Sequence, residues 1–578
     1  MTVADFIFKR LALLGIKYAF TITGGGAMHL NEALRKNTNI KSVFNHHEQA
    51  CAIAAEGYAR VTGLPAVVCV TTGPAGLNTI NGVFGQWTDS VPVIYISGQV
   101  SSNLTSYNKK VRQVGDQECR IVDIVKPITK YAHVITSVKE VENVINTAFL
   151  EAMTDRCGPV WIDIPMDIQK AEYTLVANGC PFPKKTPNPN VSKVLNKLKE
   201  FKKLLVVVGN GVRYSGSWQL LEWTLKYDIP IASTFNGMDL IPSDTENYIG
   251  RIGTIGNRAA NIALQNADAV LFLGTRNNIR QTGFNFESFA KNATKIAVDI
   301  DKNELKKNII KYDYSIVSDL KYFIEKLCDV DLATNKALSN GRWLNWNLKN
   351  SRIFRNEGYD LVTKGINPYK FIDLLTDSLS ANSTIVCGNG SACIIPYQIG
   401  TVKKGQRYIW NSGCASMGYD LPAAIGAYYA DWNNHIICIT GDGSIMMNLQ
   451  ELQTITSNNI PVKIFILNNG GYHSIKQTQK MYFDSNFYGC DSKSGVKLPN
   501  FKKIAKAFDI PYKSIKKSFG ITSEIKKTLD SSTPVICEVF IDNEYQITPK
   551  IAPRKINEKL VSTHIGDMFP FIEEPKYE

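Results

Sequence analysis

The chain has 578 residues, of which 44% are hydrophobic and 20% charged, and its formal net charge is +13. This length predicts three or four domains with large cores, and the longest apolar runs fall far short of the roughly 18 residues of a membrane span. The lysines and arginines are spread over helix-like segments, which favours a solvated surface over nucleic-acid binding. Such a surplus still attracts anionic substrates.

The chain begins with an apolar pattern, residues 1–20, that contains Lys9 and Arg10 and has no cleavage-type ending. We expect a first helix and strand there rather than a targeting segment, and a cytoplasmic protein. The twelve cysteines lie mostly in apolar strand-like runs without a Cys-x-x-Cys pair. They are typical of reduced core residues.

Residues 1–175 alternate apolar strand runs with helical patterns, which predicts a doubly wound α/β domain. Glu48 begins a helix that otherwise buries alanines, and an acid in a first turn is usually a dipole-complementing residue. His46 and His47 precede it without the acidic or cysteine partner that a metal site needs. Gly73 and Asn78 lie in an ordinary strand-to-helix turn, and we interpret them as structural.

A proline-rich linker, 180–190, separates a middle domain, expected at 190–345. Its last two strand runs end at Arg276 and at Asp299. Arginine forks bind diphosphates, and an acid at a strand end can bind ribose hydroxyls, so these residues suit a dinucleotide.

The third domain, expected at 365–550, contains a βαβ pattern between 436 and 469. Its first strand run ends in Gly441-Asp442-Gly443 and its second in Asn468-Asn469. The strands of such a unit are parallel, so Asp442 and Asn469 lie side by side at one sheet edge. A carboxylate and an amide oxygen suit Mg²⁺ shared with a diphosphate, whereas Gly-Asp-Gly alone is most often a tight turn.

This motif resembles that of the thiamine diphosphate enzymes, and the resemblance extends over nearly the whole chain, with the acetohydroxyacid (acetolactate) synthase branch most similar. It implies an α/β fold of three doubly wound domains with mainly parallel sheets. These are a pyrimidine-binding domain (1–175), a central domain of FAD-binding type (190–345) and a diphosphate-binding domain (365–550), followed by a closing tail (551–578).

The resemblance also assigns cofactor residues to this chain. Mg²⁺ would be held by Asp442, Asn469 and the backbone carbonyl of Gly471. Thiamine diphosphate would contact Glu48, Gly388, Asn389, Gly390, Ala415, Met417, Gly441, Asp442, Gly443, Ser444, Asn469, Gly471 and Tyr472. FAD would contact Gly209, Gly211, Arg276, Arg280, Asp299, Ile300 and Asp319, the alternative being a dinucleotide fold retained without FAD.

Glu48 falls on the position of the family's catalytic glutamate, where a carboxylate bonded to the aminopyrimidine ring promotes removal of the thiazolium proton. The resemblance places Gln113 and Gln117 in the catalytic set as well, and Gln86 near it. We also count Lys130 in this set, since Lys130 or Arg276 could steer an anionic donor or acceptor. In the family the pyrimidine and diphosphate sides of one site come from different subunits. We therefore expect a homodimer or homotetramer with the active site at the subunit interface.

Three departures from the synthase pattern concern the substrate. An aromatic residue of the acceptor loop becomes Asp116, and two bulky apolar positions become Thr254 and Thr478. An apolar wall discriminates single methylenes by only about 1–3 kcal/mol, so its loss suggests a different acceptor. A larger hydroxylated acceptor, such as the ketone of a nucleotide-linked deoxysugar, and the 2-keto acid of a plain synthase both stay open.

The expected activity is decarboxylation of pyruvate and transfer of the two-carbon unit to a second carbonyl. Alternatives are a 2-keto acid decarboxylase or oxidase. A non-catalytic relative would be expected to lack Glu48 or Asp442, and both are present.

Overall fold

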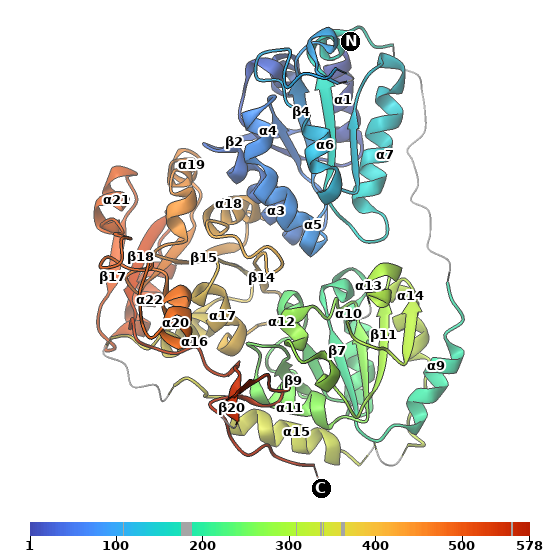
Figure 1. The fold of residues 1–578 in the computed structure, drawn as a ribbon, viewed down its shortest axis with the longest axis vertical. Helices are drawn as coiled ribbons and strands as arrows, with labels where there is room; N and C mark the ends of the chain where they lie inside the picture. Colours follow the sequence, from blue (N-terminus) through green and yellow to red (C-terminus); the bar gives the residue numbers. More distant parts are fainter. Residues whose placement is uncertain are drawn as a thin grey trace.

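The computed structural model describes residues 1–107, 109–174, 188–307, 309–335, 338, 340–359, 365–556 and 559–577. It has three lobes, each built on a six-stranded sheet whose pairings are all parallel (Figure 1). The expected fold of three doubly wound α/β domains is confirmed. Most of the expected proline-rich linker, 180–187, lies outside the described residues.

The first and third sheets share one topology, with strand orders β2-β1-β3-β4-β6-β5 and β14-β13-β15-β16-β18-β17. The first contains β1 (Tyr18–Thr21), β2 (Lys41–Phe44), β3 (Val67–Val70), β4 (Ile94–Gln99), β5 (Tyr131–Val134) and β6 (Val160–Pro165). The third contains β13 (Ser383–Cys387), β14 (Arg407–Ile409), β15 (His435–Gly441), β16 (Lys463–Asn468), β17 (Tyr512–Ile515) and β18 (Val535–Phe540). In both, the order reverses between the first and third strands of the domain, where ligands bind in such sheets.

The central sheet has a different order, β12-β11-β10-β7-β8-β9. Its strands are β7 (Leu204–Val208), β8 (Ile231–Ser233), β9 (Tyr248–Arg251), β10 (Ala269–Leu273), β11 (Thr294–Asp299) and β12 (Tyr314–Val317). Numbered within the domain, this is the 3-2-1-4-5-6 order of dinucleotide-binding folds, which reverses between β7 and β10. Both of these strands are buried along their whole length, as expected of strands covered by helices on two faces.

Helices cover both faces of each sheet (Figure 1). Those of the first domain are α1 (Val3–Leu13), α2 (Met28–Lys36), α3 (Glu48–Thr62), α4 (Pro74–Asn78), α5 (Ile80–Asp89), α6 (Ile121–Val125), α7 (Val141–Met153) and α8 (Met166–Lys170). Those of the central domain are α9 (Ser192–Lys197), α10 (Ser217–Lys226), α11 (Arg258–Asn266), α12 (Ile279–Thr282), α13 (Lys302–Lys306), α14 (Leu320–Cys328) and α15 (Arg342–Ile353). Those of the third domain are α16 (Pro368–Ser378), α17 (Ser391–Ile399), α18 (Asp420–Ala430), α19 (Glu451–Ser457), α20 (His473–Tyr482), α21 (Phe501–Ala507) and α22 (Ile521–Leu529).

One hydrophobic core extends from the first domain into the third, because α3 and α18 pack closely together (Figure 1). Two glycines permit the approach: a Cβ on Gly57 would lie 2.3 Å from the Ala423 carbonyl oxygen, and one on Gly426 would lie 1.8 Å from the Ala54 carbonyl oxygen. A larger residue at either position would push the helices apart. The two domains are therefore joined by a tight helix pair, the α3–α18 seam.

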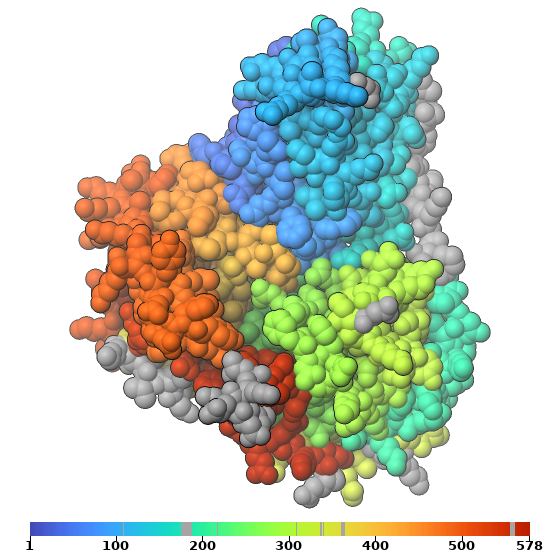
Figure 2. Space-filling view, in the orientation of Figure 1, coloured from blue at the N-terminus to red at the C-terminus, as the bar shows by residue number. Residues whose placement is uncertain are grey.

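The C-terminal segment closes on the central domain, where β19 (Lys550–Ile551) pairs with β22 (Met568–Phe569) and β20 (Arg554–Ile556) pairs with β21 (Lys559–Val561). The buried Arg258 guanidinium donates to the carbonyl oxygens of Met568 and Pro570, at 2.8 and 2.9 Å. Figure 2 shows the three lobes meeting at a common junction. Among the described residues, no helix combines the length and apolar character needed to cross a membrane.

Candidate cofactor and metal site

The candidate metal site lies at the carboxyl edge of β15 and β16. Gly441 pairs with Leu467 across these strands, so the residues that follow them, Asp442 and Asn469, are neighbours. Asp442 is buried, and its Oδ2 accepts the backbone N–H groups of Asn469, Gly470 and Gly471 at 3.2, 2.7 and 3.1 Å. Burial raises the pKa of Asp442 to about 6, against the lowering effect of these N–H groups. This carboxylate therefore fixes the loop that carries the second expected metal ligand.

The two asparagines of this loop differ in their bonding. Asn468 is satisfied, since its Nδ2 donates to Glu538 Oε1 at 2.5 Å and its Oδ1 accepts the Gly470 N–H at 3.0 Å. In contrast, Asn469 Oδ1 is buried and has no hydrogen-bond partner among the described residues. An orphaned carbonyl oxygen beside a buried carboxylate is the donor set that a hard cation takes. These residues fit Mg²⁺.

A cavity of about 200 Å³ lies against these ligands. The residues expected to contact thiamine diphosphate in the third domain line it, with the exceptions of Gly388 and Ala415; they are Asn389, Gly390, Met417, Gly441, Asp442, Gly443, Ser444, Asn469, Gly471 and Tyr472. The glycines are needed sterically, because a Cβ on Gly443 would lie 2.3 Å from the Tyr472 ring. The cavity fits a diphosphate approached by backbone.

The position of the Gly443-Ser444 turn depends on Asp420, which sequence reasoning missed. Asp420 is fully buried, and its Oδ2 accepts the Ser444 hydroxyl at 2.7 Å, while Ser444 Oγ accepts the Gly418 N–H at 2.9 Å. A Cβ on Gly388 would lie 2.4 Å from that same carboxylate oxygen. Gly388 thus packs against Asp420, behind the cavity wall, and does not line the cavity itself. A charged residue inside the apolar helix α18 was the available signal.

Glu48 opens α3 at the carboxyl edge of the first sheet, and its Oε2 accepts the Asn78 Nδ2–H at 3.0 Å. It is not among the residues that line the cavity around Asp442. Gln86 is fully buried and bonded to the Ala52 carbonyl and the Tyr95 hydroxyl, which makes it a core residue.

The loop that carries Gln113, Asp116 and Gln117 lies at the same edge. It is anchored by the buried Glu118, whose carboxylate accepts the Ser106 hydroxyl at 2.6 Å and the Val114 N–H at 2.9 Å. These hydrogen bonds lower the pKa of Glu118 against the effect of burial. Gln113, Asp116 and Gln117 are exposed on this anchored loop.

The structure does not bring Lys130 to that edge. Lys130 precedes β5, so it lies at the amino edge of the sheet, opposite Glu48, and its Nζ donates to the Thr154 carbonyl at 2.7 Å. Burial lowers the pKa of Lys130. Within one chain Lys130 thus lies away from Glu48, and its expected role at the catalytic site stays a prediction.

The three residues expected to line the substrate pocket come from three different domains. Asp116 belongs to the first domain, while Thr254 follows β9 in the central domain and donates from Oγ1 to the Arg280 carbonyl at 3.1 Å. Thr478 is exposed on α20, and its hydroxyl bonds the Ser474 carbonyl one turn back at 3.0 Å.

A second cavity, of about 350 Å³, lies at the carboxyl edge of the central sheet against the first domain. Of the residues expected to bind FAD, those that line it are Gly211, Arg276, Arg280, Asp299, Ile300 and Asp319. Gly209 does not line it; a Cβ there would lie 2.2 Å from the Gly274 carbonyl oxygen, so its role is backbone packing. The size is within the range of cofactor pockets, and the sheet order suits a dinucleotide.

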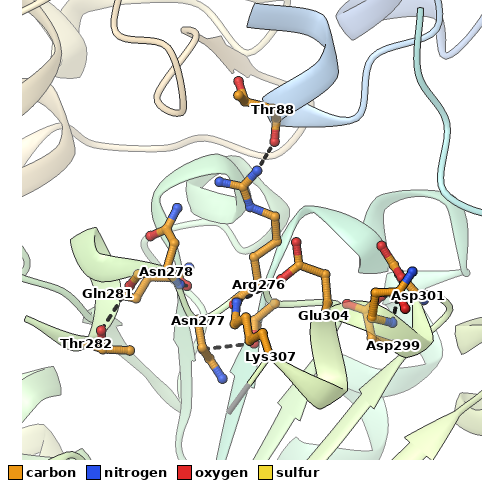
Figure 3. A network of polar contacts seen from close by, with 12 residues as sticks. Thr88, Arg276, Asn277, Asn278, Gln281, Thr282, Asp299, Asp301, Glu304 and Lys307 are labelled. Atoms are coloured by element: carbon orange, nitrogen blue, oxygen red, sulfur yellow. Dashed lines mark hydrogen bonds and ion pairs between the residues drawn. The ribbon is translucent and has the colours of Figure 1, made fainter. Parts of the chain in front are cut away.

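Charged side chains crowd this cavity (Figure 3). Arg156, which the sequence did not single out, donates to Asp301 Oδ2 at 2.9 Å and to Glu304 Oε1 at 2.7 Å. Figure 3 shows Arg276 reaching from the central domain to the Thr88 carbonyl of the first domain. Burial raises the pKa of Asp299 to about 6. The cations suit a diphosphate, so this cavity fits FAD on its donor set.

Comparison with known proteins agrees with this geometry. Residues 1–124, 191–327 and 388–539 match the N-terminal TPP binding domain, the central domain and the C-terminal TPP binding domain of thiamine pyrophosphate enzymes. These matches cover more than half of the chain, and it belongs to the thiamine pyrophosphate enzyme family.

Within that family, the chain is similar to acetolactate synthases. It is 30% identical to the acetolactate synthase large subunit of Lactococcus lactis subsp. lactis (strain IL1403), over 98% of this chain and 96% of that protein. It is also 30% identical to the chloroplastic acetolactate synthase of Arabidopsis thaliana, over 95% of this chain and 82% of that protein. The protein is a thiamine-diphosphate-dependent enzyme of the acetolactate synthase-like type.

Proposed function

We propose that this enzyme uses thiamine diphosphate and Mg²⁺ to decarboxylate pyruvate and to transfer the resulting two-carbon unit to a second carbonyl compound. The observation that carries the proposal is the buried, unpartnered Asn469 Oδ1 beside the Asp442 carboxylate. The bound cofactor supplies the electron sink for the decarboxylation.

Residues of the third domain hold the cofactor in this proposal. Asp442, Asn469 and the Gly471 carbonyl would hold the metal ion, which would neutralise charge on the diphosphate. The glycine-rich turns of the cavity would hold the diphosphate, and Met417, which lines the same cavity, would contact the cofactor rings. The low exposure of Asp442 strengthens its charge interaction with a bound cation.

Glu48 is the catalytic carboxylate in this proposal, and it binds the aminopyrimidine ring of a cofactor held by a neighbouring subunit. Gln113 and Gln117 border the same site. The first domain also exposes large apolar side chains, Leu77, Phe84 and Trp87, on and beside α5. Exposed apolar groups gathered near one edge suit a subunit interface, so we propose a homodimer or a larger homo-oligomer with two-fold symmetry.

FAD would be held in the cavity of the central domain in this proposal, where Arg276 and Arg280 would bind its diphosphate and Asp299 a ribose hydroxyl. It takes no redox part in the carboligation. It would stabilise the junction with the first domain, which Arg276 already contacts.

Two classes of acceptor are compatible with this proposal, a 2-keto acid and a larger hydroxylated ketone. The similarity to proteins named acetolactate synthase favours a 2-keto acid. The replacement of apolar residues by Asp116, Thr254 and Thr478 favours a larger hydroxylated ketone, such as a nucleotide-linked deoxysugar. Decarboxylation without an acceptor, or oxidation to an acid, is a third outcome.

The test is an incubation of the purified protein with pyruvate, thiamine diphosphate and Mg²⁺, with and without a panel of 2-keto acids and nucleotide-linked ketosugars. Products are identified by mass. We expect carbon dioxide release that depends on the cofactor, and a ligated product with one acceptor class. Acetaldehyde or acetate as the sole product under all conditions would contradict carboligation.

A further inference from the structure

A third cavity, of about 440 Å³, lies in the third domain beside the cofactor cavity. It is bounded by α20 and by the segment that follows β18, and we call it the lysine cavity after Lys476, Lys480 and Lys550, which line it. Glu544 is the one carboxylate among its lining residues. None of the expected site residues is part of it, so the cavity is unexplained by the proposed cofactor contacts.

The positive charge of the lysine cavity is only partly balanced. Lys476 Nζ lies 3.4 Å from Asp491 and 3.8 Å from the half-exposed Glu544, which also lies 3.8 Å from Lys480. Separations of 3.8 Å are too long for hydrogen bonds. Lys550 has no carboxylate partner among the described residues, and burial alone lowers its pKa. Glu544 and Asp491 therefore face Lys476 and Lys480, while Lys550 adds a third ammonium group that neither carboxylate contacts.

The remaining walls of the cavity are largely apolar. Met481, Phe487 and Phe569 line it, and the Lys476 ammonium lies 5.2 Å from the centroid of the Phe487 ring. An aromatic face beside unbalanced cations suits a ligand that has a flat ring as well as negative charges.

His473 joins the lysine cavity to the cofactor cavity, because it lines both. Its ring stacks on Tyr545 with 4.0 Å between centroids, and the Tyr545 hydroxyl bonds Ser391 and lies within reach of the Asn469 side chain. A ligand in the lysine cavity would thus lie one side chain away from the cofactor. The expected substrate residue Thr254 also touches this region, since its carbonyl accepts the Ile551 N–H at 2.8 Å.

We propose that the lysine cavity binds the diphosphate of a nucleoside-diphosphate-linked acceptor, with the lysines on the phosphates and Phe487 against the base. This proposal rests on the carboligase function proposed above and selects among its acceptors. A 2-keto acid carries a single carboxylate and leaves most of a 440 Å³ cavity unfilled. A diphosphate spreads two or more charges over several oxygens, which matches converging ammonium groups.

The test measures binding to the intact oligomer by titration calorimetry, with and without saturating thiamine diphosphate and Mg²⁺. The probes are uridine diphosphate, adenosine diphosphate, inorganic pyrophosphate and uridine. We expect the nucleoside diphosphates to bind the cofactor-saturated enzyme, pyrophosphate to bind more weakly, and uridine not to bind.

Variants locate the binding. Lys550→Ala and Lys476→Ala should each weaken nucleoside diphosphate binding about tenfold, or about 1.4 kcal/mol. Lys526→Ala is the matched control, because Lys526 is exposed on α22 outside the cavity, and it should leave the affinity unchanged. Circular dichroism verifies that each variant is folded.

Three results would overturn the proposal: no binding of either nucleoside diphosphate, equal affinity in Lys550→Ala and wild type, or displacement of the probe by thiamine diphosphate. Failure of the carboligase function is seen separately, as absent cofactor binding or absent carbon dioxide release from pyruvate. The control Lys526→Ala should release carbon dioxide from pyruvate at the wild-type rate when no acceptor is present.

Discussion

Replacement of Asn469 by alanine should have opposite consequences in the metal-free and the cofactor-saturated protein. In the metal-free protein, Asn469 Oδ1 is buried without a partner, which costs about 1–3 kcal/mol. Its removal offsets the loss of the contact with Tyr545, about 1 kcal/mol. We therefore expect the free energy of unfolding of metal-free Asn469→Ala to differ from wild type by less than about 1–2 kcal/mol.

With the cofactor present, the same variant should lose stabilisation. At ligand concentrations of about 100 Kd, binding stabilises the wild-type fold by about 2.7 kcal/mol. Even outer contacts of a metal site are worth about 10–100-fold in affinity, so loss of a direct ligand should raise Kd at least about 100-fold. The stabilisation at the same concentration then falls to about 0.4 kcal/mol.

Asn468→Ala is the matched control on the same loop. It removes a hydrogen bond to the Glu538 carboxylate and one from the Gly470 N–H, so it should destabilise the metal-free protein by about 2–4 kcal/mol. It should retain the response to Mg²⁺ and thiamine diphosphate. Urea unfolding followed by tryptophan fluorescence, with and without cofactor, measures both effects. The reasoning is refuted if Asn469→Ala is as destabilised as Asn468→Ala and still responds to the cofactor.

Other sites give further predictions. Burial raises the pKa of Asp163 from 3.8 to about 7. Between these pH values the folded protein therefore binds more protons than the unfolded chain, and its free energy of unfolding falls as pH rises, by about 4 kcal/mol in total. Asp163→Asn should flatten this pH dependence in urea unfolding, and an unchanged pH dependence would contradict the prediction. Glu48→Gln should lower kcat about 10²–10⁴-fold with cofactor affinity retained in fluorescence titration; wild-type turnover would exclude its proton role. Gly426→Ala places a Cβ 1.8 Å from a carbonyl oxygen of α3, so it should lower the free energy of unfolding by about 1–3 kcal/mol or more. The control Gly25→Ala places a Cβ in open space and should leave the free energy of unfolding nearly unchanged in the same urea titration. Arg276→Ala should lower the flavin absorbance of the purified enzyme without changing its affinity for thiamine diphosphate; full flavin content would remove Arg276 from the dinucleotide contacts.

The metal ligands at the edge of the third sheet could be predicted because each of them is fixed by the strand directly before it. Asp442 and Asn469 each follow directly after an apolar strand run, and parallel strands bring such positions together without further information. The same rule places Lys130 at the opposite edge, since it precedes its strand. Its expected role in steering an anionic substrate stays a prediction.

Contacts between distant segments could not be predicted from one sequence. Asp420 supports Ser444 only because α18 packs behind the glycine turn, and Arg156 meets Glu304 only because the first and central domains touch. Asp116, Thr254 and Thr478 show the same limit. The resemblance assigns them to one pocket, although they lie in three different domains of the chain.

The α3–α18 seam has a consequence for an assembled enzyme. Glu48 begins one helix of the seam and Asp420, which supports the turn at Ser444, begins the other. In the proposed dimer each protomer would therefore carry its contributions to two different reaction centres on one helix pair. In a mixed dimer that contains one Gly426→Ala chain, the strain would disturb both centres together, and total turnover should fall below half of the wild-type value.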